Sequence, residues 1–391
     1  MSDDLPLQRT LAAQLLVTTP IRVLLNTAYR MVVYPFSPEF SRGLGISPET
    51  YAQLLAVRSG FGLAGPLLGL VPDRFGRRFA MVLGLVIFTL SLLAVALWPN
   101  LYTFAGMLFA ALIAKSLHDP ALLAHLGDQT PYAQRGRVMG MSEFGWAGAT
   151  FVGIPMLGVL IARFGWQAPF WPLAVLGCFA IFALVWTIVE HRRPILATGQ
   201  KSKLNWRILC DPHVLAVLGL GGVISFANEI LGVVYGRWME QAFGLGAEAR
   251  GLSVSVIGLA ELLGEGIVAA FADKLGKRRM VLAATALAAV AYAALPFLSG
   301  NVWLALAGIF LVFLAFETGI VANIPILTEL MPEARSTVVS ASGMLHSIGR
   351  MAGALLGVWL FNIGFIWVGL FAALVNVLAL IMVWLGVRRG A

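Results

Sequence analysis

The chain has 391 residues, of which 59% are hydrophobic and only 12% are charged, and its formal net charge is +8. An ordinary soluble domain carries roughly 25% charged residues, so this composition excludes a soluble globular protein. The Lys and Arg residues are spread between apolar runs and form no single basic groove, which argues against nucleic acid as a partner. We therefore predict an integral multi-pass membrane protein surrounded by membrane lipid.

Twelve runs along the chain are long enough and apolar enough for membrane-spanning helices, which need about 20 residues each. The first six lie at 10–36, 50–71, 79–98, 101–126, 138–163 and 168–189. The second six lie at 212–239, 249–271, 279–298, 301–328, 337–361 and 364–386. The first run is too long for a cleavable signal, and Arg22, Asn26 and Arg30 interrupt its apolar core. Because backbone groups in lipid must be satisfied internally, we predict an all-α membrane protein with twelve transmembrane helices.

The loop after the second run is repeated in the second half of the chain. Residues 73–79 read DRFGRRF and residues 273–279 read DKLGKRR, an offset of 200 positions. A repeat at a fixed offset indicates two related units. The longest polar stretch, 190–211, lies between them. We therefore predict two pseudo-symmetric six-helix halves, 1–189 and 212–391, joined by a linker at 190–211.

The distribution of cations predicts the orientation. If the N-terminus is cytoplasmic, the basic loops after the second and eighth runs and the linker all lie in the cytoplasm. The opposite loops then hold only Arg42, Arg163, Arg237 and Arg250. By the positive-inside rule, both termini are expected to be cytoplasmic.

The repeated loop also carries a family resemblance. Residues 69–78 resemble the loop motif of the major facilitator superfamily, which is a Gly, three residues, an Asp, two residues, a Gly and two basic residues. The resemblance covers nearly the whole chain and implies the family's twelve-helix fold and secondary transport. It also implies that the two copies gate the transporter, the first by latching the halves in an outward-open state. The gating residues expected on this basis are Asp73, Arg77, Arg78, Asp273 and Arg278. The alternative is that the basic residues merely obey the positive-inside rule.

Ionisable residues inside membrane helices are costly, at roughly 2.5–3.5 kcal/mol each, so they are expected to face a cavity or one another. The family's binding cavity lies between the halves, and the charges of this chain fall largely on the helices that line it. The predicted substrate-binding residues are Arg22, Asn26, Arg30, Arg58, Lys115, Glu229, Glu317 and Arg350. The predicted proton-coupling residues are Asp119, Glu229, Glu261 and Glu265. The alternative is local neutralisation, for example of Lys115 by Asp119 one helical turn away.

Two further patterns leave their own alternatives open. Glu261 and Glu265 lie four residues apart, where two ionised carboxylates repel and a bound proton relieves the repulsion; equally, one of them answers a cation such as Arg350. His118 and His346 are isolated, and the two cysteines have no ligand spacing. We expect no metal and no cofactor.

These observations favour a monomeric secondary active transporter in a bacterial inner membrane. It would move a small organic ion or amphipathic solute by alternating access, with proton coupling. The alternative within transport is proton-driven efflux of lipophilic drugs, although Ile154 separates Gly153 from Pro155 where drug antiporters of the family have an adjacent Gly-Pro. A non-transporting membrane receptor is the alternative from another class. An enzyme is not expected, because no hydrolase motif is present, and direct ATP drive is not expected without a P-loop.

Overall fold

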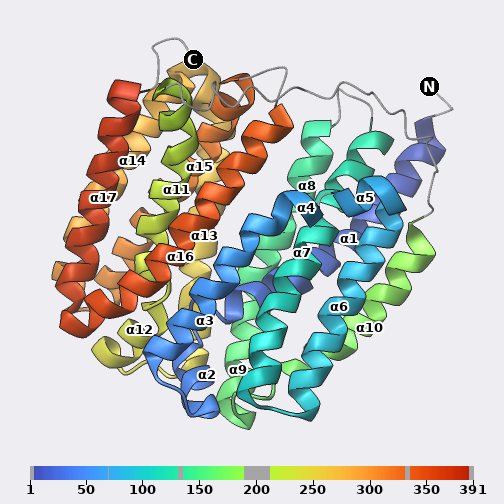
Figure 1. The fold of residues 1–391 in the computed structure, drawn as a ribbon, viewed down its shortest axis with the longest axis horizontal. Coiled ribbons are helices and arrows are strands. Elements are labelled where there is room, and N and C mark those ends of the chain that lie inside the picture. The colour runs from blue at the N-terminus through green and yellow to red at the C-terminus, as the bar shows by residue number, and fades with distance from the viewer. Residues whose placement is uncertain (1–3, 69, 131–134, 189–211, 331–334, 387–391) are drawn as a thin grey trace.

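The computed structural model describes residues 4–68, 70–130, 135–188, 212–330 and 335–386. Every regular element in these ranges is a helix (Figure 1). Eleven helical stretches of the described chain are long and apolar enough to cross a membrane. The prediction of an all-α membrane protein is therefore confirmed, whereas the predicted linker at 190–211 lies outside the described residues.

The N-terminal helices pack mainly against one another. In chain order they are α1 (Asp4–Met31), α2 (Ser37–Leu44), α3 (Pro48–Gly60), α4 (Gly65–Leu68), α5 (Leu70–Phe75), α6 (Arg77–Leu97), α7 (Leu101–Gln129), α8 (Arg135–Gly148), α9 (Ile154–Phe164) and α10 (Phe170–Thr187). A π-helical turn, η3 (Ala149–Gly153), joins α8 to α9. α6 lies against α7 and α10, and α1 lies against α8.

The C-terminal helices form a second packed group. They are α11 (Pro212–Gly232), α12 (Tyr235–Phe243), α13 (Ala247–Leu275), α14 (Lys277–Ala294), α15 (Val302–Leu330), α16 (Arg335–Ile363) and α17 (Phe365–Gly386). α11 packs on α16 and α17, and α14 packs on α15 and α17. The start of α1 and the end of α17 lie at the same end of the bundle, opposite α2 and α12 (Figure 1).

The run predicted at 50–71 is a broken helix and is not among the eleven candidate spans. A short 3₁₀ turn, η1 (Phe61–Ala64), separates α3 from α4. The Gly65 N–H bonds to the Gly62 carbonyl, one residue nearer than in an α-helix. The predicted run at 50–71 therefore contains a 3₁₀ turn and is not one continuous α-helix.

The 200-residue repeat recurs in the structure. Gly76 and Gly276 have φ of 98° and 86°, a region that favours glycine, and each is followed at once by the start of α6 or α14. The arginines two residues after these glycines make equivalent hydrogen bonds. Arg78 donates to the Val185 carbonyl near the end of α10, and Arg278 donates to the Trp384 carbonyl near the end of α17.

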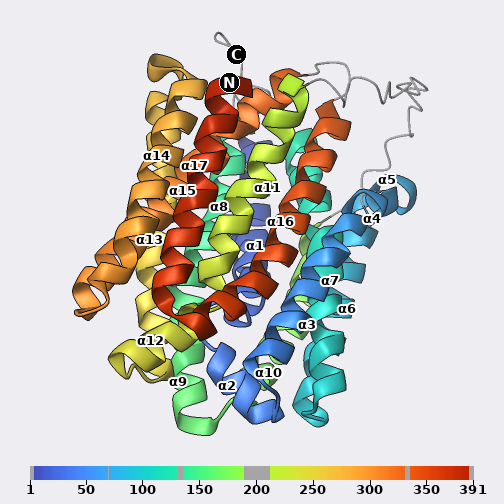
Figure 2. The same cartoon turned by 60° about the vertical axis from the view of Figure 1, so that its left-hand side comes forward.

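The N-terminal and C-terminal helices contact each other along two seams. α3 packs on α16, and α9 packs on α13 (Figure 2). Glycines make both seams close. A Cβ at Gly62 would lie 2.2 Å from the Ser347 Oγ of α16, and one at Gly158 would lie 2.9 Å from the Ala247 carbonyl oxygen of α13. Such small residues let helices approach closely in lipid.

Candidate functional site

A first cluster of charges joins α7 to α1. Lys115 Nζ lies 2.5 Å from Asp119 Oδ2 and 2.5 Å from Asn26 Oδ1. His118 Nδ1 lies 3.2 Å from the other Asp119 oxygen. The alternative that Lys115 pairs with Asp119 one turn away is therefore confirmed. These side chains are 15% and 17% exposed, so the pair sits in a largely desolvated place.

Arg22 binds the same cluster and the helix beside it. Its Nη1 donates to the Ser142 carbonyl at 2.8 Å and to the Ser142 hydroxyl at 2.5 Å, and its Nε lies 4.0 Å from Asp119 Oδ1. Gly145 of α8 makes the approach possible, since a Cβ there would lie 2.6 Å from the Arg22 Cβ. Protein acceptors therefore already bind part of the Arg22 guanidinium group.

Two aromatic rings that the sequence interpretation missed lie among these cations. The Arg58 guanidinium lies 4.0 Å from the centre of the Tyr29 ring. Lys115 and Arg30 lie 4.4 Å and 4.6 Å from the centre of the Trp146 ring. Such contacts are attractive and help to hold cations out of water. The sequence does offer one indication for Tyr29. It lies about one helical turn after Asn26, so both side chains are on the same face of α1.

One ion pair bridges the N-terminal and C-terminal helices inside the membrane region. Arg30 of α1 donates to Glu261 of α13 at 2.7 Å, and it also donates to Thr150 at 3.2 Å. Glu261 therefore forms an ion pair with a cation. That cation is Arg30, whereas Arg350 was the partner considered from the sequence. Glu265 is half-buried one turn further along the same helix.

The C-terminal helices carry a second charged group. Arg350 Nη1 lies 4.0 Å from Glu229 Oε2, which joins α16 to α11. His346, one turn before Arg350, contacts the Ser225 hydroxyl at 2.9 Å. Glu317 of α15 packs on α13, where a Cβ at Gly264 would lie 3.0 Å from the Glu317 Cβ. The structure therefore gathers the predicted substrate-binding and proton-coupling residues on facing helices.

The described gating candidates make contacts within their own helix groups. Arg77 pairs with Asp128 and donates to the Ala124 carbonyl at 2.6 Å, both on α7. Arg78 and Arg278 bond to helix ends, as described above. The side chains of Asp73 and Asp273 lie outside the described part of the structure. The latch role stays a prediction.

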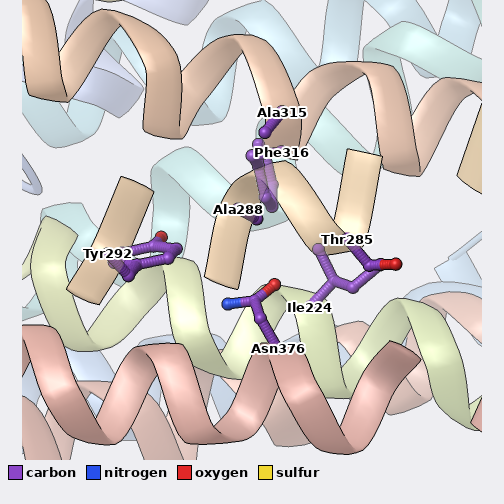
Figure 3. Close-up of a pocket in the computed structure, with 7 residues that line it drawn as sticks. All are labelled: Ile224, Thr285, Ala288, Tyr292, Ala315, Phe316 and Asn376. Carbon is purple, nitrogen blue, oxygen red and sulfur yellow. The ribbon is translucent and has the colours of Figure 1, made fainter. Parts of the chain in front are cut away.

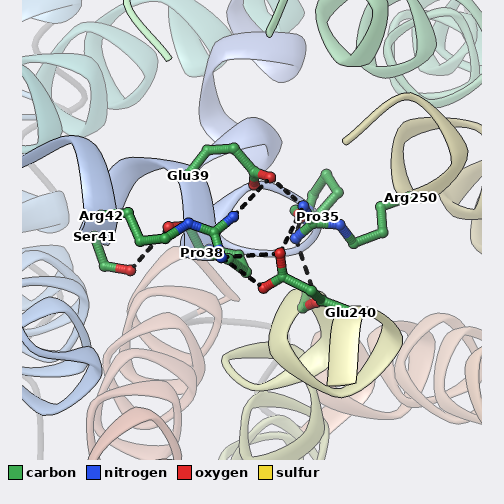
Figure 4. A network of polar contacts seen from close by, with 8 residues as sticks. Pro35, Pro38, Glu39, Ser41, Arg42, Glu240 and Arg250 are labelled. Carbon is green, nitrogen blue, oxygen red and sulfur yellow. Dashed lines mark hydrogen bonds and ion pairs between the residues drawn. The ribbon is translucent and has the colours of Figure 1, made fainter. Parts of the chain in front are cut away.

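A network that the sequence interpretation did not predict joins the two groups at the end opposite the start of α1 (Figure 4). Arg250 of α13 is fully buried, pairs with Glu39 of α2 and donates to the Pro35 carbonyl at 3.1 Å. Arg42 of α2 in turn lies 2.9 Å from Glu240 of α12. Burial raises the pKa of Glu39 above its ordinary value, an effect that exceeds the lowering by Arg250. The signal available in the sequence was the presence of opposite charges in the short segments 37–44 and 235–250.

A cavity and a groove elsewhere in the described structure are lined by no charged side chains. A cavity of about 10 Å³ lies between α11, α14, α15 and α17, and its polar lining includes Thr285, Tyr292 and Asn376 (Figure 3). That is room for about one water molecule. A groove of about 480 Å³ between α1, α9 and α10 is lined almost wholly by apolar side chains, and many of them, such as Leu16 and Phe179, are exposed. The charged residues between the helix groups are therefore the better candidate site.

Comparison with known proteins identifies the family. The family model described as Major Facilitator Superfamily matches residues 23–227 and again residues 217–391. This chain belongs to the major facilitator superfamily. It is an integral membrane transporter, and the similarity spans both groups of helices.

Individual relatives of this superfamily member are distant but similar over most of their length. The chain is 26% identical over 307 residues to the uncharacterized MFS-type transporter YceJ of Bacillus subtilis, covering 78% of this chain and 77% of that protein. It is 25% identical over 347 residues to the multi-drug resistance efflux pump PmrA of Streptococcus pneumoniae, covering 83% and 84%.

Solved structures share the fold. A bacterial homolog of the human lysosomal transporter Spinster, in an inward-facing and unoccupied conformation, has a TM-score of 0.78 at 15% identity and covers 98% of this chain and 99% of that one. A D-xylose-proton symporter has a TM-score of 0.75 at 18% identity, covering 96% and 98%. At such identities the likeness concerns the fold alone.

Proposed function

We propose that this protein is a secondary active transporter that moves a small organic ion or amphipathic solute across a bacterial plasma membrane by alternating access, with a proton as the coupling ion. The observation that carries the proposal is the Arg30–Glu261 pair, which joins the two helix groups at 2.7 Å within the membrane region. A pair of this kind has to separate if the groups rock apart.

In this proposal the broken segment 50–75 supplies the twelfth span, and the units 1–189 and 212–391 move against each other. The Glu39–Arg250 network holds the end opposite the start of α1 shut. With both termini in the cytoplasm, the closed end is the outer one, and this structure corresponds to the inward-facing state of the transport cycle. The Asp119, Glu229, Glu261 and Glu265 carboxyl groups are the candidates for the coupling proton.

A second candidate is proton-driven efflux of lipophilic compounds. It is favoured by the similarity to PmrA and to multidrug resistance protein 2 of Bacillus subtilis, to which the chain is 24% identical over 364 residues. The two candidates differ in the solute that is moved. An efflux pump would accept unrelated lipophilic cations, whereas the first proposal requires a solute whose charge meets the charged residues.

The test is solute flux in proteoliposomes with and without an imposed pH gradient. We expect proton-driven accumulation in the wild type. In Glu229→Gln we expect loss of the response to the gradient while solute exchange continues, because the variant keeps the shape but cannot exchange a proton. Arg163→Gln, at an exposed site on α9, is the control. Wild-type flux that ignores the pH gradient, or unchanged proton-driven accumulation in Glu229→Gln, would refute the coupling scheme.

A further inference from the structure

The cations inside the bundle differ in how fully protein acceptors occupy them. Arg22 donates to Ser142, Arg30 to Glu261, and Lys115 to Asp119. Arg58 of α3 is different. It is only 3% exposed, and its Nη2 atom is buried with no hydrogen-bond partner among the described residues. The buried Nε atoms of Arg22 and Arg30 also have no hydrogen-bond partner in the described part of the chain, but the Nη atoms of both arginines donate to protein acceptors. A buried guanidinium nitrogen without an acceptor is costly, and a ligand oxygen in this place would remove the cost.

Arg350 is the second incompletely occupied cation. Its ion-pair partner, Glu229, lies at 4.0 Å, beyond ordinary hydrogen-bond distance. The Arg350 side chain is 31% exposed, the largest exposure among the intramembrane cations whose ion pairs are described above. Arg350 therefore retains donors that face accessible space.

Arg58 and Arg350 lie on α3 and α16, which pack against each other. A Cβ at Gly60, two residues after Arg58, would lie 3.2 Å from the Sδ atom of Met351, the residue next to Arg350. Arg58 lies over the Tyr29 ring at 4.0 Å, and Lys115 lies 5.9 Å from the centre of the same ring. Two cations of the N-terminal helices thus lie at Tyr29, and Arg350 lies on the helix packed against α3. Tyr29 itself is half-buried, so the place is partly accessible.

The aromatic rings beside this place already contact protein cations. Arg58 lies on Tyr29, and Lys115 and Arg30 lie on Trp146. A lipophilic cation arriving here would compete with these contacts and meet like charges. An anion meets neither obstacle.

We propose that Arg58 and Arg350, with Tyr29 beside Arg58, form a subsite that binds the carboxylate or phosphate group of an organic anion. This rests on the proposed function and deepens it, since it names the chemical class of the solute. Planar guanidinium groups are well suited to such oxyanions because they offer paired N–H donors. Arg58 belongs to the N-terminal helices and Arg350 to the C-terminal helices, so one anion would contact both moving groups.

The experiment measures binding to purified full-length protein with a set of probes that share a phenyl body. Benzoate and phenyl phosphate carry an oxyanion, benzamide is neutral, and benzylammonium is a cation. We expect calorimetric titration to detect the two anions only. Arg58→Gln should weaken their binding roughly 10-fold to 100-fold, as expected for loss of a charged hydrogen bond. Arg163→Gln removes one exposed positive charge and should leave binding unchanged.

Arg350→Gln gives a second measurement and decides the question if Arg58→Gln does not fold, which its thermal transition without ligand reveals. The subsite is overturned if neither anion binds the wild type, if benzylammonium binds more tightly than both anions, or if the folded variants bind like the wild type. Proton-driven flux of another solute alongside such a result would leave the transport proposal standing. Absence of any gradient-driven flux would count against transport separately.

Discussion

Single glycines determine how closely the helices of this protein approach. On α16, a Cβ at Gly349 would lie 2.1 Å from the Gly222 carbonyl oxygen of α11, and one at Gly353 would lie 2.7 Å from the Phe226 carbonyl oxygen. Both neighbours are backbone atoms, which cannot move aside as a flexible side chain does. At the corresponding position on the N-terminal side, a Cβ at Gly153 would lie 2.0 Å from the side-chain oxygen of Thr27 of α1. The residue repeat is therefore also a packing repeat.

Gly349→Ala is expected to destabilise the protein by about 1–3 kcal/mol, because the added methyl group forces α16 away from α11. Gly343→Ala on the same helix is the matched control, since a Cβ there meets nothing within 4 Å. The control should be neutral or gain up to about 1 kcal/mol from helix propensity. Thermal unfolding in one detergent compares the two. Equal transitions for both variants would show that the close approach is unimportant.

At the same scale, the sequence predicted which residues are charged inside the membrane but not their partners. Lys115 and Asp119 are one turn apart on one helix, so local geometry alone predicts their pairing. Arg30 and Glu261 are separated by 231 positions, and only the packing of α1 on the C-terminal helices brings them together. The aromatic partners Tyr29 and Trp146 were missed for the same reason.

At the scale of elements, α2 and α12 hold the two helix groups together at one end of the bundle. Arg250→Gln leaves the half-buried Glu39 without its main partner, and removing one member of a desolvated pair costs about 3–5 kcal/mol. We expect the closed end to open. Spin labels at the exposed positions Gln53 of α3 and Gln241 of α12 should report a longer distance. In the control variant Arg163→Gln, the distance between the two spin labels should stay as in the wild type. An unchanged distance in Arg250→Gln would show that the Glu39–Arg250 pair does not hold this end closed.

The same network predicts a dependence on pH. Burial raises the pKa of Glu39 in the closed arrangement, so this arrangement binds a proton there more tightly than one in which Glu39 faces water. Acidification toward that raised pKa should favour closure, and rising pH should disfavour it, with Arg42, Arg250 and Glu240 as the neighbouring charges. Glu39→Gln cannot titrate, so its label distances should not vary in this pH range. A wild type that opens on acidification would contradict the assignment.

At the scale of the whole molecule, composition and apolar periodicity predicted the all-helical membrane fold because lipid leaves few alternatives for an apolar chain of this length. The repeated loop predicted at 73–79 and 273–279 contains a glycine of positive φ in each copy, Gly76 and Gly276. The break at η1 and the π-helical turn η3 were not predicted, because they depend on local backbone hydrogen bonding and on the neighbouring helices. Contacts between segments that are distant in sequence, including the Glu39–Arg250 pair, could not be predicted from the sequence because they form only in the folded chain.

Orientation in the membrane is the remaining prediction at this scale. The predicted topology puts the basic loops around Arg77 and Lys277 and the linker on one side, which by the positive-inside rule is expected to be the cytoplasm. In a background without Cys178 and Cys210, a cysteine at Gln241 should react with an impermeant maleimide in intact cells. A cysteine at Ser202 in the linker should react only after lysis. The reverse pattern would invert the protein, and the Glu39–Arg250 network would then close the cytoplasmic end.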